Sequence, residues 1–255
     1  MRWLNDLWSA AKVGFFSCLV TIGIAQPLPT AVAVIQGFGH VWEEKPLLAA
    51  AAVALPACIA LDRPLTELWE QSPVADVLFG AARLYGERWT PVLLAVGLYG
   101  IGWAAGEEQL RRAGLTVAGA TLLTTAVIMG IKVAVGRARP FLGQGSWLFR
   151  PPAWHDAYQS FPSGHTAVAA TLSAAVSSSL SLPPVASGAL YVVTALTALS
   201  RIYHRAHWFS DVLAGALIGY ASGQAVAQAF TPKKRAEHWS ILPTVGGVSV
   251  KVPLR

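Results

Sequence analysis

The stretch SRIYHRAHWFSD, residues 200–211, places two arginines, two histidines and an aspartate between two apolar runs. Charged side chains at the edge of an apolar segment are costly there and usually serve a purpose. His207 and Asp211 are four residues apart, so on a helix they share a face. A carboxylate bonded to one imidazole nitrogen leaves the other nitrogen free as a base, ligand or nucleophile. Arg201 adds a guanidinium that can hold an oxyanion. Alone, the stretch is equally consistent with a solvated loop before a helix.

A second cationic stretch, KVAVGRARP, covers residues 132–140. Lys132 and Arg139 are seven residues apart, which corresponds to two helical turns, so we expect both cations on one helix face. Taken alone, the pair is also explained by two side chains that extend toward a lipid surface. Arg137 lies between them and is interpreted either as an auxiliary cation or as one that faces lipid headgroups.

A third stretch, FPSGHT at residues 161–166, opens an apolar run. Ser163 can cap a helix, and Gly164 allows another group to approach the backbone closely. The N-terminus of the helix presents free N–H groups to an anion, and His165 sits at the same place. An ordinary capped helix start is the alternative interpretation.

Together the three stretches supply three cations, a helix N-terminus, two histidines and one carboxylate, all expected at segment ends on one side. Such a set is hard to attribute to chance in a chain with so few charges. A phosphate presents several anionic oxygens for cations and N–H groups to hold, so the set favours phosphoryl transfer.

The same stretches resemble the three-part signature of the type 2 phosphatidic acid phosphatase superfamily, a group of membrane lipid phosphatases, acid phosphatases and vanadium haloperoxidases. The signature reads Lys, six residues, Arg-Pro; then Pro-Ser-Gly-His; then Ser-Arg, five residues, His, three residues, Asp. Every position is present here in that order. The resemblance covers about residues 45–230.

This resemblance implies a role for each signature residue. The phosphate-binding residues that it implies are Lys132, Arg139, Ser163, Gly164 and Arg201. His207 would attack phosphorus to form a phosphohistidine, Asp211 would orient its ring, and His165 would protonate the leaving oxygen. The resemblance implies no metal and no other cofactor, because fixed cations would stabilise the transition state in place of Mg²⁺.

The composition favours an integral membrane protein, because 54% of the 255 residues are hydrophobic and only 13% are charged. A soluble domain carries about 25% charged residues. The net charge of +6 is not arranged in a basic stripe with aromatic residues between, so we expect membrane lipids and no nucleic acid as partners. Cys18 and Cys58 lie in apolar runs without metal-type spacing, so we expect free cysteines.

Six segments are apolar enough to span or nearly span a bilayer. They are residues 45–62, 89–106, 113–135, 164–182, 185–203 and 211–230. The sequence therefore predicts an all-α bundle of six transmembrane helices. The fourth and sixth segments are rich in Ala, Ser and Gly, which is typical of helices packed closely against neighbours. The longer connections are residues 63–88 and 140–162.

The predicted phosphatase domain, residues 45–230, lies between two further regions. Residues 1–44 hold an apolar run behind basic residues, which is typical either of a signal peptide or of an uncleaved helix at the membrane. Residues 231–255 form a basic tail whose last part, ILPTVGGVSVKVPLR, alternates like a short strand.

The arginines and lysines indicate an orientation in the cell membrane, which is the inner membrane in a Gram-negative cell. With Arg111, Arg112 and the cluster 233–235 inside, the site falls on the extracytoplasmic face. The aromatic connection 140–162, with His155 and Asp156, then either caps the site or forms an ordinary interfacial belt.

The predicted activity is hydrolysis of a phosphomonoester or pyrophosphate, with a lipid phosphate as the substrate class. Headgroup contacts lie outside the signature, so phosphatidic acid, phosphatidylglycerol phosphate and isoprenyl pyrophosphate all stay open, as does the oligomeric state. One alternative is a vanadate-dependent haloperoxidase, although those relatives are large soluble proteins. The other is a non-catalytic anion-binding membrane protein, which would not need two histidines.

Overall fold

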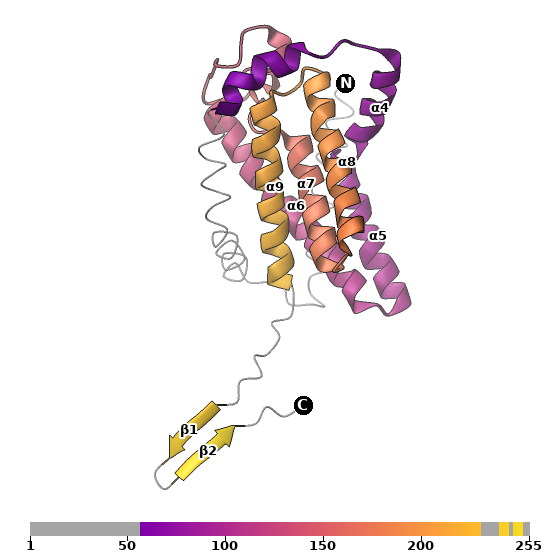
Figure 1. Ribbon diagram of the computed structural model, residues 1–255, viewed down its shortest axis with the longest axis vertical. Coiled ribbons are helices and arrows are strands. Elements are labelled where there is room, and N and C mark those ends of the chain that lie inside the picture. The colour runs from indigo at the N-terminus through magenta and orange to yellow at the C-terminus, as the bar shows by residue number, and fades with distance from the viewer. Residues whose placement is uncertain (1–56, 231–239, 245–246, 252–255) are drawn as a thin grey trace.

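The computed structural model describes residues 57–230, 240–244 and 247–251 (Figure 1). Residues 57–230 form a helical bundle, which confirms the all-α class expected for this domain. Its helices are residues 57–67, α4 (Pro73–Leu84), α5 (Trp89–Ala105), α6 (Glu108–Val135), α7 (Gly164–Ser179), α8 (Pro184–Tyr203) and α9 (Phe209–Phe230). Two short 3₁₀ turns, η1 (Pro140–Leu142) and η2 (Asp156–Tyr158), lie between α6 and α7.

The alternating pattern of the tail forms two strands, β1 (Ser240–Thr244) and β2 (Gly247–Lys251). They pair antiparallel, with Ser240 opposite Lys251 and Thr244 opposite Gly247. The expected strand is thus a hairpin.

Five of the six predicted apolar segments correspond to α5 through α9, with small shifts at their ends. The helix α6 begins at Glu108, five residues before the expected start, and Glu108 pairs there with Arg111 of its first turn. Of the first segment, residues 45–56 lie outside the described residues. Residues 57–67 are helical and continue past the expected end at residue 62.

The helix α4 was not predicted, because residues 63–88 were interpreted as a connection. The local signals were nevertheless present: the Ser72 hydroxyl caps the first turn by accepting from the Ala75 N–H at 3.2 Å, and Pro73 takes the first helical position. Tyr203 at the end of α8 holds the start of α4 in place. Its hydroxyl accepts from the Ser72 N–H at 3.0 Å and donates to the Asp76 carboxylate at 2.7 Å.

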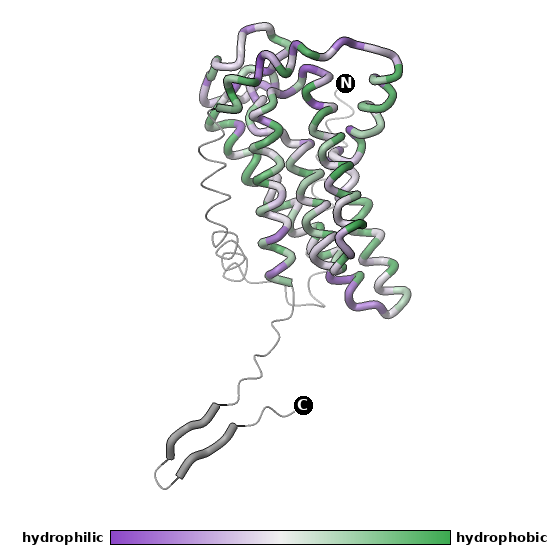
Figure 2. The backbone as a smooth tube through the Cα atoms, in the orientation of Figure 1, coloured by the Kyte–Doolittle hydropathy of each residue, from purple (hydrophilic) through white to green (hydrophobic). Residues whose placement is uncertain are grey.

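Two described helices, α6 and α8, are long and apolar enough to cross a membrane by length and composition. The helix α5 is apolar but has 17 residues. Figure 2 shows apolar residues along the length of the bundle, with polar stretches gathered toward its two ends. This distribution is the one expected for a bundle with an apolar surround in its middle.

The helix α7 lies at the centre of the bundle and packs against α6, α8 and α9. Its contact with α9 depends on Gly215, Gly219 and Gly223, which occur at every fourth residue. A Cβ atom at Gly219 would lie 2.1 Å from the Ala167 carbonyl oxygen, and one at Gly215 would lie 2.4 Å from that of Ser163. The close packing expected of these two Ala-, Ser- and Gly-rich segments is confirmed.

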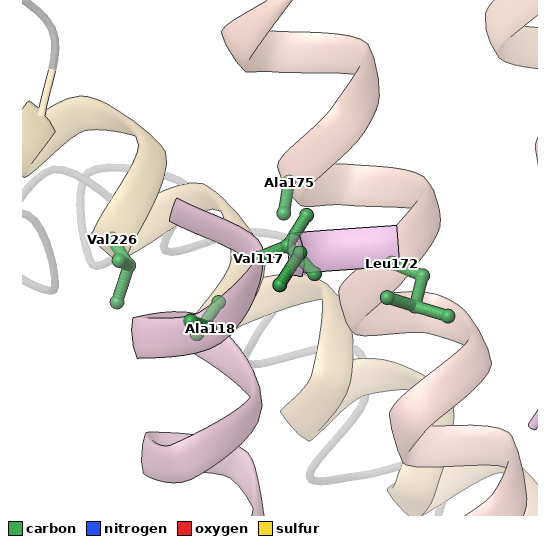
Figure 3. Close-up of a cluster of buried hydrophobic side chains, with 7 residues drawn as sticks. Val117, Ala118, Leu172, Ala175 and Val226 are labelled. Carbon is green, nitrogen blue, oxygen red and sulfur yellow. The ribbon is translucent and has the colours of Figure 1, made fainter. Parts of the chain in front are cut away.

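Apolar contacts and hydroxyl bonds together hold α6, α7 and α9. Val117 and Ala118 of α6, Leu172 and Ala175 of α7, and Val226 of α9 form a buried cluster (Figure 3). Nearer the site, the hydroxyls of Thr124 and Thr171 bond at 2.8 Å, and Thr171 also lies 3.1 Å from the Gly219 carbonyl. Hydroxyls are suited to this position because they bridge helices whose backbones lie close together.

We predict that Gly219→Ala destabilises the bundle, because the new Cβ meets backbone rather than a movable side chain. Forced overpacking of this kind costs about 1–3 kcal/mol. Thermal unfolding in detergent should show the loss. Gly188→Ala in α8 is the matched control, since a Cβ there meets nothing within 4 Å, and it should leave stability unchanged or slightly raised. Equal unfolding temperatures for Gly219→Ala and wild type would contradict the close contact.

Candidate active site

The three signature stretches meet at one end of the bundle, where α6 ends, α7 begins and α8 turns into α9 (Figure 1). A cavity of about 370 Å³ opens at this end. The signature residues that line it are Lys132, Arg139, Gly164, His165 and His207. Ser163, Arg201 and Asp211 are not among its lining residues. Two cations and two histidines from distant segments therefore share one cavity.

Lys132 and Arg139 reach the cavity from different elements. Lys132 is in the last turn of α6 and its Nζ donates to the Gln159 carbonyl. Gly136 ends the helix with a φ of 64°, and Arg139 lies beyond it. The expectation that one helix face carries both cations is therefore wrong. Glycine is required at position 136 because the backbone there is left-handed and because a Cβ would lie 2.4 Å from the Arg150 carbonyl oxygen.

Arg139 is held by the connection that precedes α7. Its Nε donates to the Asp156 carbonyl at 2.9 Å, and its Nη2 pairs with the Asp156 carboxylate at 2.7 Å. Asp156 is an exposed residue that also lines the cavity. A bound anion would therefore share Arg139 with a carboxylate that water already reaches.

His207 is almost fully buried, with 2% of its side chain exposed, and lies in the turn before α9. Its Nδ1 is 2.7 Å from the Ser160 carbonyl, which only accepts hydrogen bonds, so Nδ1 carries the proton. Burial, followed by the charges of Lys132, Arg139 and Arg201, holds the pKa of His207 well below its usual range. The ring is thus neutral at physiological pH, with its lone pair on Nε2.

Asp211 does not bond directly to His207, because their nearest oxygen and nitrogen are 3.8 Å apart. His207 precedes the first residue of α9, so the helical spacing used to pair them does not apply. The Asp211 carboxylate instead accepts from the Ser160 hydroxyl and from the Trp208 N–H at 2.9 Å. Asp211 therefore positions His207 indirectly. It binds Ser160, whose carbonyl binds the His207 ring, and it binds the backbone of Trp208, the residue after His207.

Ser163 and Arg201 form the second layer of the site. Ser163 is buried at the N-cap of α7, where its N–H donates to the Asp211 carbonyl at 2.9 Å, and its hydroxyl accepts from Thr166. Arg201 is 8% exposed, and its Nε has no hydrogen-bond partner among the described residues. A buried guanidinium nitrogen without a partner is costly, and an anion in the cavity is one way to compensate it.

Arg137 is the largest fully buried side chain of the described residues, so the interpretation that it faces headgroups is wrong. Its Nη2 pairs with Asp62 at 2.5 Å and its Nη1 with Asp211 at 2.6 Å. Both carboxylates also bind neighbours, and Asp62 accepts from the Ser210 N–H and hydroxyl at 2.7 Å each. Arg137 therefore ties the helix of residues 57–67 to the start of α9.

Sequence reasoning missed Glu87, Asp62 and Ser160. Glu87 lies in the turn between α4 and α5, lines the cavity, and places its Oε1 3.3 Å from His165 Nε2. The sequence signal that could have indicated them is that acidic residues are rare in this chain, which has 13. An acidic residue beside an apolar run is therefore a candidate for a structural or functional role. In the part of the chain that the structure describes, no group of three or more His, Cys, Asp or Glu side chains is arranged to hold a metal ion.

The family model of the PAP2 superfamily matches residues 113–235, a range that contains all eight signature residues. The match confirms, for this region of the chain, the resemblance stated from the three stretches.

Three curated relatives are each named lipid A 1-phosphatase. The protein of Rhizobium etli is 38% identical over 108 residues, which are 40% of this chain and 45% of that protein. The protein of Rhizobium johnstonii is 37% identical over 108 residues, covering 40% and 43%. That of Porphyromonas gingivalis is 32% identical over 137 residues, covering 52% and 27%. The matches thus span less than half the length of these relatives.

One solved structure, the crystal structure of Aquifex aeolicus LpxE, is similar with a TM-score of 0.49 and 24% sequence identity. The similarity covers 63% of this chain and 88% of that chain.

We predict that Arg137→Met destabilises the fold strongly, because it leaves Asp62 and Asp211 buried without their shared cation. Removing one partner of a buried ion pair costs about 3–5 kcal/mol. Arg63→Met is the matched control: Arg63 pairs with Glu67 at 2.8 Å, but both side chains are exposed, and exposed pairs contribute about 0–1 kcal/mol. Thermal unfolding in detergent compares the two variants. A similar, small loss in both would contradict the structural role of Arg137.

Proposed function

We propose that this protein is a membrane phosphatase that hydrolyses a phosphomonoester or pyrophosphate of a lipid, through a phosphohistidine and without a metal. The observation that carries this proposal is the shared cavity, in which two cations and a neutral, buried His207 lie beside His165. A neutral imidazole whose Nδ1 is already bonded is prepared to act as a nucleophile at Nε2. The similarity to three lipid A 1-phosphatases supports the same reaction class.

In the proposed mechanism, the cations Lys132, Arg139 and Arg201 bind the phosphate oxygens. Ser163 and the Gly164 N–H, at the N-terminus of α7, bind them as well. The His207 Nε2 lone pair attacks phosphorus, and the bond to the leaving oxygen breaks. His165 gives that oxygen a proton. A water then attacks the phosphohistidine, His165 takes a proton from it, and free phosphate leaves with His207 neutral again. The Ser160 carbonyl, held by Asp211, stabilises the positive ring in between.

The shape of the cavity supports a lipid as the substrate. From Lys132 the cavity continues along α6 past Met129, Ile128 and Thr125, which precede Lys132 by one to two turns. Met129 and Thr125 are exposed, so this part of the cavity wall reaches the surface of α6. A phosphate can therefore sit among the cations while an acyl or prenyl chain extends past Met129. The names of the relatives make the 1-phosphate of lipid A the first candidate.

We also propose the six-span arrangement, with the site at the extracytoplasmic face of the cell membrane. Asp62 contacts Arg137, so the end of the first predicted segment lies at the same end of the bundle as the site. The α5–α6 turn, with Arg111 and Arg112, lies at the opposite end (Figure 1). Each of the helices α5, α6, α7, α8 and α9 runs from one end of the bundle to the other, so successive connections alternate between the two ends. Such alternation is what a chain that crosses a bilayer repeatedly requires. Arginines at the far end favour its placement inside.

We predict that His207→Ala abolishes phosphate release from lipid phosphates, assayed in EDTA, while the protein still unfolds at a similar temperature. Wild type quenched during turnover should carry acid-labile phosphate, and the variant should carry none, because the phosphorus–nitrogen bond needs the Nε2 lone pair. His204→Ala is the control: His204 is exposed and bonds the Ser200 carbonyl, so its loss should leave the activity near that of wild type. Substantial turnover by His207→Ala would reject the nucleophile.

We predict that Met129→Trp blocks long-chain substrates but spares p-nitrophenyl phosphate, since the indole narrows the opening along α6 and leaves the cations untouched. The ratio kcat/KM for a long-chain lipid phosphate should fall at least about tenfold. Val192→Trp, at an exposed position of α8 that does not line the cavity, is the matched control. If both substrates were affected equally, the chain would not lie along Met129.

A further inference from the structure

The carboxylate of Glu87 faces His165 across the edge of the cavity. Glu87 Oε1 is 3.3 Å from His165 Nε2, and the two side chains are 26% and 29% exposed. His165 Nε2 has no aligned hydrogen-bond partner among the described residues, and the Glu87 carboxylate is an acceptor that lies within reach of it. Hydrogen bonds of catalytic groups are often long before substrate binds and tighten in the substrate complex.

The turn that carries Glu87 is built against the start of α7. A Cβ atom at Gly86 would lie 2.4 Å from the His165 carbonyl oxygen, so the turn lies directly on the backbone of His165. The turn is closed by hydrogen bonds from the Gly86 N–H to the Arg83 carbonyl and from the Glu87 N–H to the Leu84 carbonyl, at 3.0 and 3.2 Å. Glu87 is therefore placed by packing rather than by a flexible loop.

The charges around His165 oppose each other. Burial is the largest influence that disfavours a protonated His165, and Arg201 of α8 and Arg83 of α4 act in the same direction. His207 also lies close enough to interact with His165. Glu87 is the carboxylate that favours the protonated ring. Burial raises the pKa of Glu87, but His165, Arg83 and Arg88 outweigh burial and hold that pKa below its usual value. Glu87 thus remains ionised at physiological pH.

We propose that Glu87 is a positioning residue that holds the Nε2 proton of His165, so that His165 Nδ1 exchanges the proton with the leaving oxygen. This inference rests on the proposed function. When the phosphorus–oxygen bond breaks, its electron pair stays on the leaving oxygen, which takes the Nδ1 proton, and Glu87 keeps the remaining proton on Nε2. In the second step Nδ1 takes a proton from the attacking water as its oxygen bonds to phosphorus. The carboxylate stabilises the protonated ring that starts each cycle.

The test is the pH profile and leaving-group dependence of Glu87→Gln in the full-length protein. A lipid phosphate leaves as an alkoxide that needs the proton, whereas p-nitrophenolate leaves without one. We expect kcat to fall at least about tenfold for the lipid phosphate and far less for p-nitrophenyl phosphate. Because the neutral amide no longer favours the protonated His165, the alkaline limb of the lipid profile should move to lower pH. Glu87→Asp, which keeps the charge, should retain more activity than Glu87→Gln.

Glu67→Gln is the matched control, since Glu67 is exposed, pairs with Arg63 and does not line the cavity. It should behave as wild type. Equal losses for both substrates, an unshifted alkaline limb, or no loss at all in a folded Glu87→Gln would overturn the role of Glu87 while leaving the phosphatase assignment intact. A wild-type protein that cleaves neither substrate would overturn the proposed function and this inference with it.

Discussion

The arrangement of the site depends on one buried guanidinium. Arg137 lies between Asp62 and Asp211, residues separated from it by more than 70 positions in each direction. Two carboxylates and one cation without access to water are stable only as a set, because the loss of any member leaves an uncompensated buried charge. Asp211 in turn fixes Ser160, and Ser160 binds His207. The position of His207, the proposed nucleophile, therefore depends on a series of contacts that ends at Asp62. Asp62 belongs to the helix of residues 57–67, which does not line the cavity.

The cations at this end of the bundle fall into two kinds. Arg137 is paired with Asp62 and Asp211 and does not line the cavity, so its charge stabilises the fold. Among the described residues, Lys132 bonds a carbonyl, Arg139 shares an exposed carboxylate, and Arg201 has a buried nitrogen without a partner. This difference gives the cavity an excess of positive charge. Burial, together with this excess, keeps His207 neutral. A carboxylate beside His165 suits the proposed mechanism, in which one histidine acts without its proton and the other with it.

Short-range patterns in the sequence were reliable, and long-range pairings were not. The three stretches, the helices α5 to α9 and the close α7–α9 contact follow from motif spacing, apolar length and small residues within one segment. Arg137 was misjudged because its partners are Asp62 and Asp211, and nothing local identifies either. Arg139 and His207 were expected on helices, but α6 ends four residues before Arg139 and α9 begins two residues after His207. Gly136 and the α8–α9 turn interrupt the helical period. Glu87 meets His165 only because the turn between α4 and α5 packs on the start of α7, while α4 packs on α8 and α5 packs on α6.

The glycine stripe of α9 has a consequence for the order of biosynthesis. The helix α9 is the last of the bundle to leave the ribosome, and its glycines carry no side chains that must be reordered when it docks on α7. Until it docks, Asp211 is absent from the ends of Arg137 and Ser160, and the turn bearing His207 lacks the bond from the Trp208 N–H to Asp211. For the proposed phosphatase, a nascent chain that holds Lys132, Arg139 and His165 without a docked α9 therefore lacks a positioned nucleophile, and the proposed site is completed in the final step of assembly.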